Sequence, residues 1–142
     1  MKSVMLSMVL SGCGISPPII NPELSKYIQE FTSDCGNHGA NLANLTALRY
    51  VNFTDDIDGE GGSVGVCWQG VSTYNYLWFT SIEVKRMPTE IEQKALMYHE
   101  LGHCVLALDH VPDTIMSTNM LGAEAYSADW DNMVEALCNR YQ

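Results

Sequence analysis

The sequence YHELGHCVLALDH, at residues 98–110, determines most of what can be predicted for this chain of 142 residues. His99 and His103 lie four residues apart, and Glu100 directly follows the first histidine. On an α-helix, side chains at i and i+4 lie one turn above each other, so both imidazoles can bind one tetrahedral metal ion. Glu100 would face the same cleft without binding the metal and could act as a general base. The spacing therefore predicts the active site of a zinc hydrolase.

A helix is predicted around this motif. Thr89 can cap its start, and Glu92, three residues later, completes a capping box. From residue 91 to residue 108 the only glycine or proline is Gly102, and apolar residues fall on several faces, so the helix should be buried nearly all round. Buried histidines can also be core residues that bond to the backbone. Their ligand spacing, with a third histidine at 110, favours a metal site.

The segment resembles the metzincins, whose pattern is H-E-x-x-H-x-x-G-x-x-H followed by a methionine-containing turn below the metal. This chain has Leu106 where the pattern has glycine, and Asp109 where it has the third histidine. If the register is kept, Asp109 is the third ligand, as in the snapalysin branch. If one residue is inserted after His103, Ala107 replaces the glycine and His110 is the ligand. We favour His110, because imidazole is a good zinc ligand with a well-defined bond length. Asp109 would then support the site or cap the turn.

The resemblance implies more of the site and the fold. Residues 111–117, VPDTIMS, would form the methionine-containing turn, with Met116 as an apolar floor below the zinc. The expected fold is α+β: a small zincin or metzincin-like domain whose mixed, twisted sheet of three to five strands packs on a central active-site helix. N-terminal and C-terminal helices complete it. The implied activity is that of a monomeric zinc-dependent endopeptidase, a metalloprotease with one catalytic Zn²⁺. A zinc-activated water would attack the peptide bond, with Glu100 as general base.

The remaining secondary structure is predicted from apolar periodicity and capping residues. The metzincin resemblance implies that one strand is an open sheet edge above the cleft, to which a polypeptide substrate could add through its main chain. The predicted elements are a helix that begins at residues 21–23, a strand at 45–53, strands at 63–68 and 76–85 with a turn at 69–75, and a C-terminal helix that begins at residues 127–130.

The N-terminus resembles a bacterial lipoprotein signal peptide. Residues 4–10 are apolar, and Leu-Ser-Gly-Cys at residues 10–13 resembles a lipobox. Cleavage before Cys13 and its lipidation would anchor the chain to the cell envelope, on the periplasmic or cell-surface side. The alternative is a buried N-terminal strand. The predicted organisation is a signal peptide at residues 1–12, a lipidated tether at 13–20 and one catalytic domain at 21–142.

The four other cysteines form an even set, which in an oxidising compartment predicts two disulfides with three possible connectivities. We favour Cys67–Cys104, because Cys104 lies on the active-site helix and Cys67 in a strand that should pack nearby. Cys35 and Cys138, which follow the first helix and end the last, would form the other pair. A second metal site is disfavoured, since no C-x-x-C pair exists.

Composition adds less about function. The formal net charge of −10 argues against nucleic acid and anionic membrane surfaces as partners. Asp56 and Asp58 lie in a glycine-rich loop that resembles part of a calcium-binding loop, but the later bidentate glutamate is absent, and a solvated turn is favoured over a Ca²⁺ site. Beside the endopeptidase, the sequence leaves open a non-catalytic zinc-containing envelope lipoprotein, in which Asp109 and His110 would both bind the metal.

Overall fold

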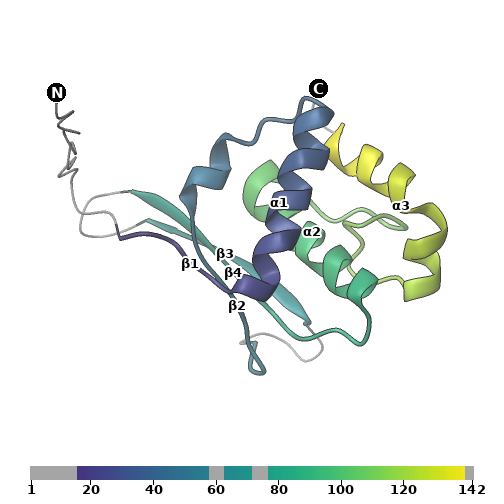
Figure 1. Ribbon diagram of the computed structural model, residues 1–142, viewed down its shortest axis with the longest axis horizontal. Helices are drawn as coiled ribbons and strands as arrows, with labels where there is room; N and C mark the ends of the chain where they lie inside the picture. The colour runs from purple at the N-terminus through teal and green to yellow at the C-terminus, as the bar shows by residue number, and fades with distance from the viewer. Residues whose placement is uncertain (1–15, 58–62, 72–76, 140–142) are drawn as a thin grey trace, which may run out of the picture.

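The computed structural model describes residues 16–57, 63–71 and 77–139 (Figure 1). The described chain has three α-helices and a four-stranded mixed sheet, which confirms the α+β class. The predicted signal peptide, Cys13 and Asp58 lie outside the described residues. The elements in chain order are β1 (Ile19–Ile20), α1 (Pro22–Asn37), the 3₁₀-helix η1 (Ala43–Ala47), β2 (Leu48–Phe53), β3 (Gly65–Val71), β4 (Trp78–Val84), α2 (Glu90–Leu106) and α3 (Ala123–Cys138).

The sheet has the strand order β1-β2-β4-β3. β1, β2 and β4 are parallel, whereas β3 pairs with β4 in the antiparallel sense and forms one edge of the sheet. α2 contacts β3 and β4 on one side and α1 and α3 on the other, so it is the central helix of the domain (Figure 1). The core therefore surrounds α2, and ten of its residues are buried.

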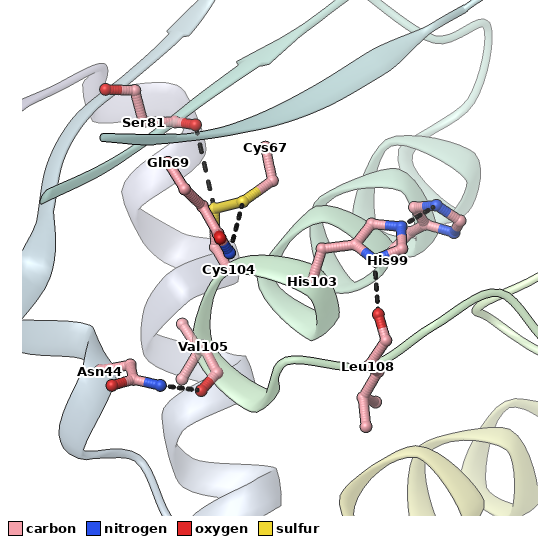
Figure 2. The surroundings of a disulfide bond; sticks show 9 residues. All are labelled: Asn44, Cys67, Gln69, Ser81, His99, His103, Cys104, Val105 and Leu108. Atoms are coloured by element: carbon pink, nitrogen blue, oxygen red, sulfur yellow. Dashed lines mark hydrogen bonds between the residues drawn. A yellow bond between two sulfur atoms is a disulfide. The ribbon is translucent and has the colours of Figure 1, made fainter. Parts of the chain in front are cut away.

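The start of α2 has the predicted cap. The Thr89 hydroxyl oxygen accepts a hydrogen bond from the backbone N–H of Glu92 at 3.3 Å, and the Thr89 hydroxyl donates to the Glu92 carboxylate at 2.6 Å. The helix ends at Leu106, two residues earlier than expected, because Ala107 adopts the left-handed conformation with φ 54° and ψ 38°. At this end the Asn44 side chain donates a hydrogen bond to the Val105 carbonyl at 3.1 Å (Figure 2).

The left-handed turn at Ala107 predicts a stabilising substitution. A side chain with a Cβ atom is disfavoured at positive φ, whereas glycine adopts this conformation freely. Ala107→Gly should therefore raise the free energy of unfolding by about 0.5–1 kcal/mol, after the larger unfolded-state entropy of glycine is subtracted. Urea unfolding of both proteins measures the difference, and a destabilised variant would contradict the prediction.

Several predicted element boundaries were wrong. Residues 43–47 form η1, so β2 begins at Leu48 rather than at residue 45. β3 begins at Gly65 and continues to Val71, into the region predicted as a turn. α3 begins at Ala123 after Gly122, not near residue 127, and Asp129 has non-helical angles that kink it. The capping residues that suggested a helix start at 127–130 thus mark a kink within a longer helix.

Two disulfides connect the helices to the rest of the fold. Cys67 bonds to Cys104, which links β3 to α2 (Figure 2), and Cys35 bonds to Cys138, which links α1 to α3. Both pairs are those that the sequence analysis favoured. Among the described residues, no helix is both long enough and apolar enough to cross a membrane.

Candidate metal centre and cleft

Three histidines converge at the C-terminal half of α2. His99 and His103 lie on α2, and His110 lies in the segment that follows the left-handed turn. The Nε2 atom of His103 lies 3.1 Å from Nε2 of His99 and 3.2 Å from Nε2 of His110. The side chains of His99 and His103 are neighbours on the helix in Figure 2. Within the described part of the chain, this is the one cluster of three or more histidine, cysteine or carboxylate groups with ligand geometry.

Backbone carbonyls determine which nitrogen of each helical imidazole carries the proton. Nδ1 of His99 lies 2.8 Å from the Ile115 carbonyl oxygen, and Nδ1 of His103 lies 2.6 Å from that of Leu108. A carbonyl can only accept, so each Nδ1 must donate. Burial lowers the pKa of His99 to about 4 and also lowers the pKa of His103. Both rings are therefore neutral near pH 7, and each presents an unprotonated Nε2.

These unprotonated Nε2 atoms fit a metal ion. Two nitrogen lone pairs about 3 Å apart repel each other unless a cation lies between them. Zn–N bonds of about 2.0–2.1 Å in a tetrahedral arrangement place ligand nitrogens roughly 3.3 Å apart. The distances of 3.1 and 3.2 Å are close to this value. The donor set, its spacing and the protonation pattern therefore suit a divalent metal such as zinc.

The structure brings His110, and not Asp109, into this cluster. Both residues are exposed and adjacent in sequence, but only the His110 ring reaches the other two imidazoles. The turn at Ala107 makes this possible, because it ends the helix and returns the chain toward His103. This agrees with the register that contains one inserted residue.

Glu100 is buried between α2 and the edge strand. Its exposed fraction is 3%. A Cβ atom on Gly65 of β3 would lie 2.5 Å from its Oε1 atom and 2.8 Å from Leu96, so a side chain at this position would displace the carboxyl group or the Leu96 side chain. Burial raises the pKa of Glu100 to about 8. A carboxyl group with such a pKa is suited to exchange protons near neutral pH.

The raised pKa of Glu100 predicts a pH dependence of stability in the metal-free chain. Between its ordinary pKa of 4.5 and about 8, the unfolded chain ionises this group while the folded chain keeps it protonated. Below pH 4.5 the burial of this group therefore costs the folded chain no ionisation energy. As the pH rises from 4.5 toward 8, the free energy of unfolding falls by up to about 1.4 kcal/mol per pH unit. Glu100→Gln should remove this loss, so the variant gains stability over the wild type from pH 5 to 8. Urea unfolding with a chelator present measures it, and a difference independent of pH would contradict it.

Met116, the expected apolar floor of the site, packs against α2 at Gly102. It is fully buried, and a Cβ atom on Gly102 would overlap its sulfur, so the side chain packs directly on the helix backbone next to His103. A hydrogen bond from the Val111 N–H to the Met116 carbonyl at 2.8 Å closes the turn around Met116. The Thr114 hydroxyl donates to the Val111 carbonyl and accepts from the Met116 N–H within the same turn. The adjacent Ile115 carbonyl accepts from His99, so this turn both supports and orients the ligand set.

A cleft of about 850 Å³ opens over the three histidines and Glu100. One wall is β3, the edge strand, and the opposite wall is formed by residues 107–110 and 117–120. The sequence pointed to the three clustered histidines and Glu100 but not to the roles of Gly65 and Gly102. Gly102 was visible as the lone glycine in the helical segment, whereas nothing in the strand sequence marked Gly65 as the residue that makes space for Glu100.

Among the described residues, no calcium site forms at Asp56, where the sequence made a Ca²⁺ site the less favoured alternative to a solvated turn. Asp56 is exposed, and its backbone N–H donates to the Thr54 hydroxyl at 3.2 Å in a local turn. No cluster of three or more ligand groups forms around it in the described ranges, and Asp58 lies outside them. The favoured solvated turn remains the simpler interpretation.

Comparisons with protein-family models, with curated proteins and with solved structures found no match to this chain. The case for a function therefore depends on the residues and geometry described above.

Proposed function

We propose that this protein is a zinc-dependent endopeptidase that hydrolyses peptide bonds of extracytoplasmic proteins. The observation that carries the proposal is the convergence of three Nε2 atoms beside a buried carboxyl group at the base of an open cleft. This combination provides a metal site and a proton carrier in one place. Such a pairing suits metal-assisted hydrolysis of an amide by water.

His99, His103 and His110 would hold the zinc ion. When bound, the ion polarises a carbonyl group and lowers the pKa of a water molecule. The two carbonyls that bind Nδ1 of His99 and His103 keep these rings in one orientation and one tautomer. In known zinc sites, groups that form such hydrogen bonds to the ligands help to maintain metal affinity.

Glu100 would carry the proton. Its carboxylate would accept a proton from the attacking water and pass it to the leaving amine. The carboxyl group lies against Gly65 of β3, and both residues line the cleft. Burial makes the carboxyl group a stronger base than an exposed glutamate, which supports this role.

The substrate would be an extended polypeptide that pairs with β3. This strand uses one edge to pair with β4, and residues 63–67 and 69 line the cleft. A peptide strand could add to the free edge through its main chain. Recognition would then depend mainly on backbone hydrogen bonds, with the cleft walls selecting side chains.

The non-catalytic alternative needs a fourth protein ligand that closes the site. In the described chain only three histidines cluster, and Asp109 is not among them. A site with three protein ligands leaves one position for water or substrate, which favours catalysis over a purely structural role.

The two disulfides support a location outside the cytoplasm. A lipid anchor at Cys13 remains part of the proposal, based on the lipobox-like sequence alone.

Metal removal tests the proposed function. The full chain should contain one zinc ion per molecule and should cleave a mixed library of unstructured peptides. Dialysis against a chelator should abolish cleavage, and stoichiometric zinc should restore it, because the histidines alone provide no Lewis acid. Mass spectrometry of the products measures both effects. Zinc binding without any cleavage would instead support the structural role.

A further inference from the structure

The large apolar side chains that the described chain exposes lie between the middle of the sheet and one of its ends. They are Ile19, Trp68, Val71, Leu77 and Trp78, which we call the apolar end. Strand pairing places Ile19, Tyr50, Ser81 and Trp68 in one row across the sheet. Val71 pairs with Trp78 farther toward the end at which β4 begins, on the left in Figure 1. The exposed fractions are 68% for Ile19, 52% for Val71 and 49% for Trp78.

These side chains extend from both faces of the sheet. Cys67 bonds to α2, so alternate residues of β3, including Val71, lie on the helix side. Trp78 lies on this side too, because it alternates with the buried Thr80 and Ile82. Trp68 lies on the opposite face, where it donates a hydrogen bond to Glu83 at 3.0 Å. A partner that covered one face of the sheet would leave the other side chains in water, so the partner must meet the end of the sheet.

The same end carries little charge. In a chain with a net charge of −10, residues 3–22 and 64–82 contain no Asp, Glu, Lys, Arg or His. These ranges include β1 and β3, and most of β4. Half-buried Arg49, near the start of β2, is the one cation on the four described strands, and the Glu83 carboxylate bonds to Trp68. A surface with little charge and exposed tryptophans matches the interface zone of a lipid bilayer, where tryptophan is enriched. It does not match an anionic surface, because one half-buried cation is too little to bind one.

We propose that the apolar end docks on the surface of a zwitterionic lipid bilayer, with Val71, Leu77 and Trp78 in the interface zone. β1 begins at this end, so residues 16–18 enter the fold beside the proposed contact. The uncharged run at residues 3–15 directly precedes them in the sequence. Two weak contacts with one bilayer hold a protein far more firmly than either alone. This proposal does not depend on the hydrolase activity.

Vesicle co-sedimentation tests the proposal. The full chain is made in a cell-free system that does not lipidate Cys13, and it is mixed with phosphatidylcholine vesicles. The key variant is Val71→Glu, and the control is Ala128→Glu, which places the same charge on an exposed position of α3. Circular dichroism checks that each variant is folded.

We expect the wild type and the Ala128→Glu variant to bind the vesicles equally. Val71→Glu should reduce the partition coefficient by about tenfold or more, because a carboxylate resists transfer into the interface. Binding should be insensitive to salt, and tryptophan emission should shift to shorter wavelength on vesicles but much less so in a Trp78→Phe variant. Equal binding of Val71→Glu would mean that the N-terminal run alone binds lipid, and would overturn the proposal. Failure of the wild type to bind, or self-association that Val71→Glu abolishes, would also overturn it.

Discussion

Glu100→Gln should leave zinc binding intact while reducing peptide hydrolysis by roughly 10²–10⁴-fold, the range typical of a lost general base. The amide of glutamine has nearly the same shape, so the space beside Gly65 stays filled and the fold is kept. It cannot accept a proton from water at neutral pH. Because the three histidines are unchanged, the zinc content should remain one ion per chain.

The measurement is the rate of product formation from one cleaved peptide, with zinc content determined on the same preparation. Glu135→Gln, an exposed position on α3, is the matched control and should retain full activity. Loss of zinc from Glu100→Gln would indicate a structural role for the carboxyl group. Full activity in this variant would disprove the assigned mechanism.

His110→Ala should lower zinc affinity far more than Asp109→Ala does. Removal of a residue that only supports a ligand typically costs about 10- to 100-fold in metal affinity. Removal of one ligand of three should exceed that range, because the Nε2 atom 3.2 Å from His103 is lost altogether. Asp109 is exposed and outside the cluster, so Asp109→Ala should change affinity by about tenfold at most.

Competition with a chromophoric chelator measures both affinities under the same conditions. The two variants are well matched, since both positions are adjacent, exposed and outside regular secondary structure. The reverse ranking would assign the third ligand to Asp109 and restore the unshifted register of the family pattern.

Residues 89–105 were predictable because local chemistry specifies them. The Thr89 cap, the apolar faces of the helix and the ligand spacing of His99 and His103 are all encoded within a few residues. The favoured disulfides followed from the same logic, since each cysteine lay on an element whose neighbours could be inferred.

What could not be predicted depends on long-range contacts or on unusual backbone angles. Alanine rarely adopts a left-handed conformation, so the sequence could not reveal that Ala107 ends α2. β1 has only two residues and exists because it pairs with β2, which no local pattern indicates. The extension of α3 to Ala123 escaped prediction because Gly122 forms no side-chain cap, whereas Ser127 resembles one.

The candidate site also combines residues that local sequence specifies with contacts that only the tertiary fold creates. The ligands could be identified from their spacing, but the fit between Gly65 and Glu100 joins residues from β3 and α2 that only the folded chain brings together. The overlap that a Cβ atom on Gly102 would have with Met116 is likewise a tertiary contact. The sequence therefore predicted which residues meet at the candidate site, and the structure supplied the packing that positions them.

The most direct test of the central claim is a crystal structure of the zinc-loaded Glu100→Gln variant with a bound peptide. We expect one zinc ion bound by Nε2 of His99, His103 and His110, with the peptide extended along the free edge of β3 and its carbonyl group directed at the metal. A zinc ion enclosed by four protein ligands, or a peptide bound away from the cleft, would contradict the proposal that this protein is a zinc endopeptidase.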